Sequence, residues 1–213
     1  MARKEYDFSG FTEVEARNAL KVEIRRADTY SIAVEADEEV LNDIKLTVAA
    51  GRLTARLEAR WGHLGLLFKG SPTPKVLIAM PSLQAVEFAA ASRGEITGFA
   101  GGGLFKVELA GASKLSGDVA CGTLEIMAGA ASHVELTGKA DSAAVELSGA
   151  SNANLEKMSL GDAKVKLGGA STATLNLTGK LDADVTGASS LRWLGTPEMG
   201  NIKITGASSF SRK

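Results

Sequence analysis

The sequence contains few cysteine, proline and aromatic residues and almost no net charge. Cys121 is the only cysteine among 213 residues, so an intramolecular disulfide and a cysteine metal cluster are both excluded. We expect it to be a small buried core residue. Lysine and arginine number 24 and aspartate and glutamate 25, which leaves a net charge of −1. This balance gives no electrostatic reason to expect nucleic acid or an anionic membrane surface as a partner.

Long apolar runs are also absent. No segment approaches the roughly 20 consecutive apolar residues that a membrane span requires, so we expect no membrane span. Residues 1–6 lack the apolar stretch of a secretory signal. Two locations stay open: the protein is cytoplasmic, or a leader has been removed and the protein lies in the periplasm or on the cell surface.

Glycine, in contrast, is abundant, with 24 residues, and much of it belongs to a repeat. The tripeptide Gly-Ala-Ser, or a looser copy of it, ends a short apolar run many times in the second half of the chain. A period near 20 residues is typical of a solenoid, in which each repeat buries its apolar face by stacking on its neighbours. The serines stand 18 to 21 residues apart, at Ser92, Ser113, Ser132, Ser151, Ser171, Ser189 and Ser208.

Aligned on these serines, the repeats contain two columns of mostly apolar residues. Residues two apart in a strand face the same side, so both columns point inward. Stacked aliphatic columns need parallel, in-register strands about 4.8 Å apart. The first column is Val86, Val107, Ile126, Val145, Val165, Ala183 and Ile202, and the second is Phe88, Leu109, Ala128, Leu147, Leu167, Val185 and Ile204.

This pattern predicts an all-β fold, a right-handed parallel β-helix over residues 82–213 with about six to seven coils of 18–21 residues. Three short strands per coil fit this length, and the strict six-residue pattern of a left-handed β-helix is absent. At each corner, glycine allows the bend, alanine keeps the corner thin, and serine hydrogen-bonds a neighbouring backbone group or the next serine. Trp193 stands where earlier coils have an inward leucine, and we interpret it as a core plug.

Residues 1–81 have strand patterns that are not in register with the repeats. We expect a β-rich region with hairpins that caps the open end of the solenoid, continuous with residues 82–213. Residues 37–44 are the one candidate helix, with Asp37 as its N-cap. Alternating apolar and polar residues predict two antiparallel hairpins, one from 20–25 and 30–36 and one from 45–48 and 53–59.

Two features of this N-terminal region bear on partners. The segment from Trp61 to Phe68 is apolar and broken by glycines. It either packs inside the monomer or forms a subunit contact in a homo-oligomer or a ligand-facing patch. Arg52, Arg56 and Arg60 follow the polar face of a strand, which favours a solvated face over an anion site.

Candidate catalytic carboxylates are few. Stacked coils would place Glu87 and Glu108 one strand spacing apart. This separation is compatible with the two acids of a glycoside hydrolase. Their outward column, however, mixes acids and lysines, which is typical of a solvated, mutually neutralised face. Aspartates near the turns are expected there for backbone reasons. The column continues with Met127, Glu146, Lys166, Asp184 and Lys203, and the turn aspartates are Asp118, Asp141, Asp162, Asp182 and Asp184.

Other catalytic or binding motifs are also missing. His63 and His133 are the only histidines, and neither has a partnered serine and aspartate in its sequence context. Residues 101–103 are three glycines without the lysine and helix of a phosphate-binding loop. We therefore predict no catalytic, cofactor-binding or metal-binding residue.

The order of these segments resembles a bacterial family, the putative auto-transporter adhesin head GIN domain, over nearly the whole chain. The resemblance implies a right-handed β-helix with a β-rich N-terminal part and an extracytoplasmic setting. It supplies no catalytic residues. The segments that carry it are 11–14, 20–24, 30–35, 51–54 and 76–83, followed by the Gly-Ala-Ser coils.

The leading hypothesis is a non-enzymatic surface or periplasmic module, adhesin-like, whose flat faces bind a glycan or a protein, or which serves as a rigid spacer. Extended stacked faces suit repetitive partners because each coil offers similar contacts at a fixed pitch. Two alternatives are a carbohydrate-active enzyme on the same scaffold and a cytoplasmic assembly or signalling scaffold.

Overall fold

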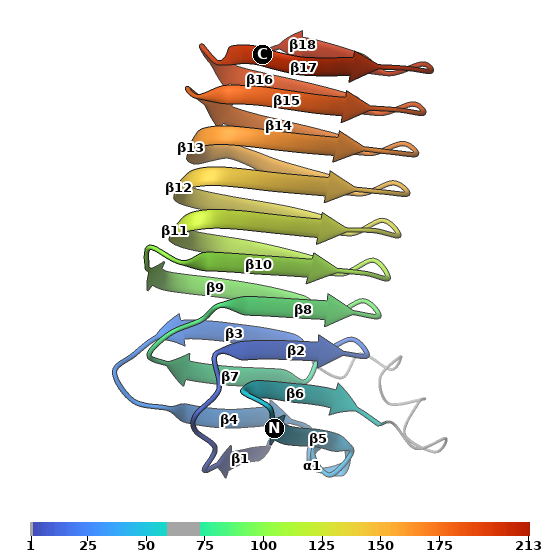
Figure 1. Ribbon diagram of the computed structural model, residues 1–213. Helices are drawn as coiled ribbons and strands as arrows, with labels where there is room; N and C mark the ends of the chain where they lie inside the picture. The colour runs from blue at the N-terminus through green and yellow to red at the C-terminus, as the bar shows by residue number, and fades with distance from the viewer. Residues whose placement is uncertain (1, 59–72) are drawn as a thin grey trace.

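The protein forms a flattened, right-handed β-solenoid with a curled sheet at its N-terminal end (Figure 1). The computed structural model describes residues 2–58 and 73–213. Its elements are β1 (Ala2–Tyr6), β2 (Glu13–Arg17), β3 (Lys21–Arg26), β4 (Ser31–Ala36), α1 (Glu38–Leu41), β5 (Ile44–Ala49), β6 (Arg52–Leu57), β7 (Lys75–Met80), β8 (Ala85–Ala89), β9 (Arg93–Ala100), β10 (Leu104–Leu109), β11 (Lys114–Ala128), β12 (His133–Leu147), β13 (Asn152–Leu167), β14 (Thr172–Leu177), β15 (Lys180–Val185), β16 (Ser190–Gly195), β17 (Glu198–Ile204) and β18 (Ser209–Arg212).

Each coil has two strand faces, which we call the front and rear stacks. The front stack is β6, β2, β8, β10, the second halves of β11, β12 and β13, then β15 and β17. The rear stack is β7, β3, β9, the first halves of β11 to β13, then β14, β16 and β18. Strands β11 to β13 bend from the rear to the front without a break, so the prediction of three separate short strands per coil is wrong for these coils.

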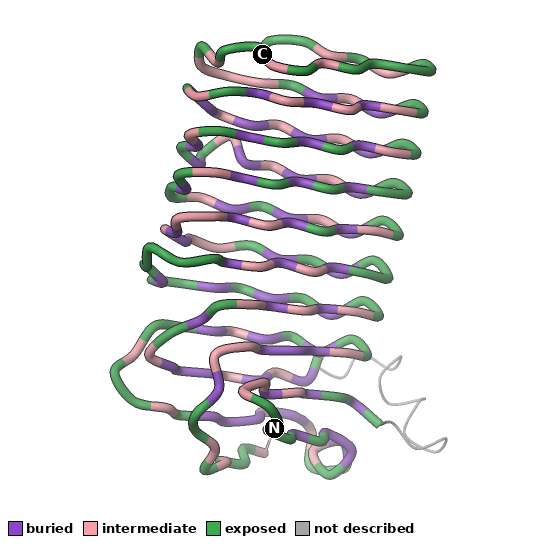
Figure 2. The backbone as a smooth tube through the Cα atoms, in the orientation of Figure 1, coloured by how far each residue is buried: buried purple, intermediate pink, exposed green. Residues whose placement is uncertain are grey.

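The predicted inward columns are confirmed except in the last coil, where Ile202 is half-buried and Ile204 is 36% exposed. Val107 pairs with Ile126, Ile126 with Val145 and Val145 with Val165, all in parallel register. These side chains are almost fully buried, and buried and more exposed residues alternate along the rungs (Figure 2). The two columns therefore form the core, and burying them stabilises each coil only when its neighbours are present.

The serine corners are confirmed as well. The six serines from Ser92 to Ser189 are at most 1% exposed. In most corners the hydroxyl donates to the carbonyl three residues earlier, as from Ser113 to Ala110 at 2.8 Å. Between coils, the Ser132 amide donates to the Ser151 hydroxyl oxygen at 3.3 Å. The hydroxyls thus satisfy backbone groups that the bend removes from the strand ladder.

The N-terminal region differs from the expectation that it is out of register with the repeats. Strand β2 pairs in parallel with β8, Val14 opposite Val86, and β3 pairs in parallel with β9, Ile24 opposite Ile96. Leu20 is buried in the position that serine takes in later corners. Residues 13–26 therefore form a coil of the solenoid, and β6 and β7 add a rung below it.

One predicted hairpin is wrong and the other is confirmed. Strands β3 and β4 do not pair, because β7 lies between them, parallel to β3 and antiparallel to β4. Strands β5 and β6 form the second hairpin, with Ile44 opposite Leu57. The helix α1 has four residues, and Asp37 stands at its N-cap without a side-chain capping hydrogen bond.

The two ends of the solenoid are built differently. Strands β1, β4 and β5 and helix α1 close the N-terminal end, with β1 antiparallel to β4 (Figure 1). At the other end, Trp193 stacks in register above Leu175, and its ring lies 4.2 Å from that of Phe210. Trp193 is half-buried and packs against the core, as a core plug would. The segment from Trp61 to Phe68 lies outside the described residues.

Candidate functional site

The lower part of the front face carries an ion-pair network formed by Glu13, Glu15, Glu87, Arg17, Arg52 and Arg56, which we call the Arg–Glu network. Glu87 accepts hydrogen bonds from Arg17 and Arg52, both at 2.8 Å. Arg52 also reaches Glu13 at 2.9 Å. The network links β6, β2 and β8, so it fastens the curled sheet to the solenoid. Arg52 and Arg56 are thus ion-paired, and Arg60 lies outside the described residues.

Glu15 is the buried member of this network, with 5% of its surface exposed. Burial alone would raise the pKa of its carboxyl group. The positive charges of Arg17 and Arg56, with hydrogen bonds from Arg17 and Thr54, outweigh burial, and the pKa of Glu15 is lowered from its usual value of 4.5. Glu15 is therefore held as a carboxylate at neutral pH.

The candidate acid pair Glu87 and Glu108 is brought together as the sequence predicts. The two residues are opposite each other on adjacent strands β8 and β10. Each has its own cationic partners, however: Glu87 binds two arginines of the Arg–Glu network, and Glu108 binds Lys106. Both carboxylates line a surface hollow of about 260 Å³, but each is already neutralised by its ion pairs, unlike the free acid and base that hydrolysis of a sugar bond requires.

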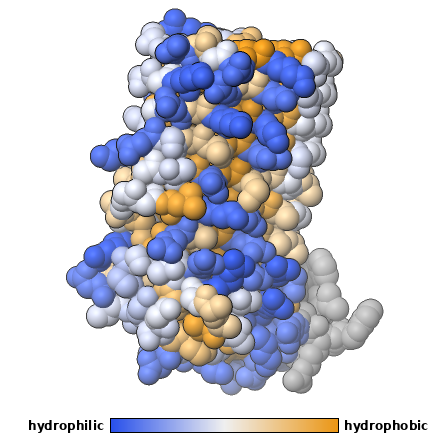
Figure 3. Space-filling model, in the orientation of Figure 1, coloured by the Kyte–Doolittle hydropathy of each residue, from blue (hydrophilic) through white to orange (hydrophobic). Residues whose placement is uncertain are grey.

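Above the Arg–Glu network the front face is less tightly paired. Met127 follows Glu108 in the same outward column and is 40% exposed, with Glu146 next to it. Glu146 and Lys166 lie 3.8 Å apart, and Asp184 and Lys203 lie 3.7 Å apart. These loose pairs confirm a neutralised solvated column. Apolar surface lies between the charged side chains on this face (Figure 3).

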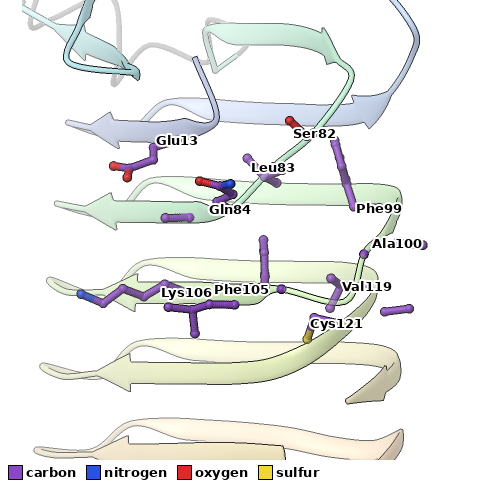
Figure 4. A pocket seen from close by; sticks show the side chains of 15 residues that line it. Glu13, Ser82, Leu83, Gln84, Phe99, Ala100, Phe105, Lys106, Val119 and Cys121 are labelled. Atoms are coloured by element: carbon purple, nitrogen blue, oxygen red, sulfur yellow. The ribbon is translucent and has the colours of Figure 1, made fainter. Parts of the chain in front are cut away.

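A side cleft of about 430 Å³ lies where the chain enters the solenoid (Figure 4). Its walls come from the connection before β8, the end of β9 and the start of β10. Phe99, Phe105 and Val119 are buried in its apolar wall, while Leu104 is 49% exposed. Glu13, Gln84 and Lys106 supply its polar lining. The cleft has the size of a small-molecule site but only a few polar groups.

Cys121 is part of the wall of this cleft. It is 9% exposed, which confirms the buried core residue expected from the sequence. Burial, together with the nearby Asp141, raises the pKa of the Cys121 thiol to about 11. The group is therefore a thiol at neutral pH and a poor nucleophile.

Three of the five predicted turn aspartates have the expected backbone role, whereas Asp184 lies within β15 and pairs with Lys203. Asp118, Asp162 and Asp182 accept hydrogen bonds from backbone amides of the adjacent coil at 2.6 to 2.9 Å. The amide of Asn201 accordingly lowers the pKa of Asp182. The three glycines at 101–103 make the turn between β9 and β10, where the Gly103 carbonyl accepts from the amides of Gly122 and Thr123.

The rear face carries cations at one position of successive rungs. Arg93, Lys114 and His133 each follow a corner serine and stand opposite one another in register. Burial, with the charge of Lys114, lowers the pKa of His133. The neighbouring hydroxyl of Ser132 donates to the Gly129 carbonyl. This geometry does not form a nucleophilic triad, and His63 lies outside the described residues.

The sequence pattern alone did not indicate the Arg–Glu network or the side cleft. The partners in the network are up to 70 residues apart, as between Arg17 and Glu87. Alternating acids and arginines in Glu13–Arg17 and Arg52–Leu57 were the available signal, but only the stacking of β6, β2 and β8 brings them together. The exposed Leu104 beside three glycines was the signal for the cleft.

Within residues 2–58 and 73–213, no group of three or more His, Cys, Asp or Glu side chains could hold a metal ion. In the same part of the chain, no helix has the length and apolar character that a membrane crossing demands.

The chain is similar to several solved structures, and each of these matches covers 100% of this chain. A "putative adhesin" from Bacteroides fragilis has a TM-score of 0.85 at 16% identity over 96% of its own chain. A "Putative lipid binding protein" from Parabacteroides distasonis has 0.73 at 15% over 96%, and a "putative adhesin" from Parabacteroides merdae has 0.72 at 14% over 95%. At these identities the likeness shows a shared fold. A comparison with curated proteins gave no match.

The sequence itself matches a family model over residues 10–197, which includes the strands from β2 to β16. The match covers segments of both the N-terminal region and the repeats, as the resemblance in the sequence implied. The chain therefore belongs to the family described as "Putative auto-transporter adhesin, head GIN domain".

Proposed function

We propose that this protein is a non-enzymatic, adhesin-like binding module of the bacterial cell envelope, whose outer faces bind a glycan or a protein. The observation that carries the proposal is the family match over residues 10–197, together with a rigid stack of parallel rungs. Stacked rungs repeat their outward side chains at a fixed pitch of about 4.8 Å, which suits a repetitive or extended partner.

The front face above the Arg–Glu network is the better candidate surface. It combines exposed Met127 with the loosely paired Glu146 and Lys166, so its charges can exchange partners at little cost. The Arg–Glu network, in contrast, is tied to the fold, because its carboxylates and guanidiniums already bind one another.

A binding experiment on arrayed bacterial and host glycans and on extracellular matrix proteins tests this proposal. We expect a ligand that the wild-type protein retains and Met127→Glu loses. Leu104→Glu is the matched control, because Leu104 is similarly exposed but lies in the side cleft, at the opposite end of its rung from the position of Met127. Equal binding by all three proteins, or no ligand at all, would contradict binding through the front face.

The enzyme alternative has its own test. A screen for hydrolysis of polysaccharides with the wild-type protein, Glu87→Gln and Glu108→Gln would detect glycosidase activity at the acid pair that the sequence suggested. We expect no hydrolysis by any of them, since both carboxylates are ion-paired. Hydrolysis that either substitution abolishes would overturn the non-enzymatic proposal.

The cell-envelope location and oligomeric state belong to the same proposal. Fractionation of the native bacterium, with the protein followed by antibody, should place it outside the cytoplasm. A homo-oligomer through the segment from Trp61 to Phe68 stays a prediction. Light scattering should then give more than one chain for the wild-type protein and one chain for Leu66→Asp.

A further inference from the structure

The lower corners of the solenoid are those of Ala19, Ala91, Ala112 and Ala131. The hydrogen bonds between these corners all point in the same direction and form a ladder. In each bond, an alanine amide donates to the carbonyl of the corner in the next coil up. The bonds run from Ala19 to Ala90 at 2.8 Å, from Ala91 to Gly111 at 2.7 Å and from Ala112 to Ala130 at 2.9 Å. Each corner peptide thus has its carbonyl pointing toward the N-terminal end and its N–H pointing toward the C-terminal end.

The upper corners form a ladder with the opposite direction. Here the alanine amide donates down, from Ala170 to Gly149 at 2.7 Å, from Ala188 to Gly169 at 2.7 Å and from Ala207 to Gly187 at 2.8 Å. The backbone angles agree with this reversal. Both central residues have positive φ in the lower corners, as in Ala130 and Ala131, whereas among the upper central residues only the glycines do.

The two ladders meet between the corner of Ala130 and Ala131 and the corner of Gly149 and Ala150. A trans peptide holds its C=O and N–H on opposite sides. The Ala130 carbonyl points down to Ala112, so the Ala131 N–H points up. The Gly149 carbonyl points up to Ala170, so the Ala150 N–H points down. Two donors therefore face each other, and neither has a backbone or side-chain acceptor in the described part of the chain.

This junction is open and electropositive. Both alanines are exposed, and a Cβ placed on Gly149 would lie only 3.9 Å from the Ala131 nitrogen, so the two corners are in close contact. Each donor ends a chain of four hydrogen-bonded peptides whose dipoles add, and both positive ends meet here. Segments 129–133 and 148–152 contain no acidic residue, and they contain one imidazole, His133.

We propose that the Ala131 and Ala150 amides form a binding site for a small oxyanion, a carboxylate or sulfate group. Two convergent amides at the positive ends of peptide chains are the arrangement that binds anions in backbone nests. Both corners are exposed and carry small side chains, so an anion approaching from solvent would bridge the ladders. This inference rests on the corner geometry alone and does not depend on the proposed adhesin-like function.

Titration of the isotope-labelled full chain with sodium sulfate and sodium acetate, followed by amide NMR, tests the site. The Ala131 and Ala150 amides should shift downfield in a saturable manner, while sodium chloride at equal ionic strength should produce no saturable shift. The Ala112 and Ala188 amides are internal controls, because they occupy the same corner position and already donate. Equal or unsaturable shifts at all four amides would overturn the proposal.

Two variants test the site independently, so the failure of one variant to fold leaves the other as a test. Ala150→Pro removes one donor at a residue whose φ is not positive, and saturable binding should be lost. His133→Glu adds a negative charge beside the junction and should weaken binding about threefold. Thr172→Glu, at the same position two coils higher, is the control and should bind like the wild-type protein. Unchanged binding in both site variants would show that the anion sits elsewhere.

Discussion

The lower and upper corners of this solenoid use nearly the same tripeptide in two different conformations. In the lower corners both central residues have positive φ, and alanine is accepted at the first position, as in Ala90 and Ala130. In the upper corners only the first residue has positive φ, and it is always glycine. The tripeptide therefore specifies a bend without specifying which way its central peptide points.

The peptide direction explains why glycine is needed in only one set. In the upper corners above the first, at Gly169, Gly187 and Gly206, the carbonyl of the coil below points up into the space of the next Cβ. A Cβ on Gly169 or Gly187 would lie 2.5 or 2.4 Å from that carbonyl oxygen. In a lower corner, a Cβ on Gly111 would only approach the Ala90 amide at 3.0 Å. Alanine fits there at the cost of a left-handed backbone, about 1 kcal/mol.

The largest expected effect comes from Gly187→Ala in an upper corner. The added methyl group meets backbone that cannot move without breaking the ladder, so we expect a loss of about 3 kcal/mol or more in the free energy of unfolding. Gly51→Ala is the matched control, since Gly51 has a similar φ of +77° but nothing within 4 Å of its Cβ. It should cost only about 1 kcal/mol. Urea unfolding would measure both, and similar losses would contradict the steric argument.

The corner serines should contribute more to stability in the interior corners than in the last corner. Ser171 is fully buried and donates to the Gly168 carbonyl at 2.8 Å, so Ser171→Ala should destabilise the protein by about 1–2 kcal/mol. Ser208 is less buried, and water can replace its hydroxyl. Ser208→Ala should therefore cost less than about 0.5 kcal/mol. Thermal unfolding would compare the two, and a larger loss in Ser208→Ala would refute this reading of the corner.

The charged lower front face and the loosely paired upper one should respond differently to pH. Glu15→Gln should lower stability by about 1 kcal/mol at pH 7. The pKa of Glu15 is lowered on folding, so its contribution exists above the unfolded value of 4.5 and disappears as pH falls through the folded value. The difference from the wild-type protein should vanish in acid. Glu146→Gln is the control and should change little at any pH, which denaturation at pH 7 and pH 3 would show.

The smallest expected effect is a gain. Ala130→Gly removes the strain of a left-handed alanine with φ of +52°, and we expect up to about 1 kcal/mol of added stability. Ala188 has no positive φ in its upper corner, so Ala188→Gly should instead destabilise slightly through the more flexible unfolded chain. Chemical denaturation should show changes of opposite sign in the free energy of unfolding of the two variants. Changes of the same sign would argue against two corner conformations.

Much of the solenoid could be predicted because its repeat is local. Each coil places the same residue types at the same positions, so the alignment of Val107, Ile126 and Val145 gives the register directly. The first coil, β2 and β3, escaped detection because 58 residues, 27–84, separate it from β8. Its corner also reads Asn18-Ala19-Leu20, without the glycine and serine of the later copies.

The candidate surfaces were less predictable than the fold. The acid pair Glu87 and Glu108 was placed correctly, but its arginine partners Arg17 and Arg52 come from strands whose stacking no local pattern reveals. The two hairpins make the same point. Alternation identifies a strand and its buried face, but it does not say which strand lies beside it, and β7 entered between β3 and β4.

The sequence by itself determined the parallel solenoid, its inward columns and its serine corners, because side-chain period and chain period are both local properties. Only the tertiary structure decided that the N-terminal strands extend the stack, and that the corner peptides reverse between Ala131 and Ala150. A peptide can turn over without changing the side chains around it. Its direction is therefore selected by the carbonyls and amides of the coils above and below.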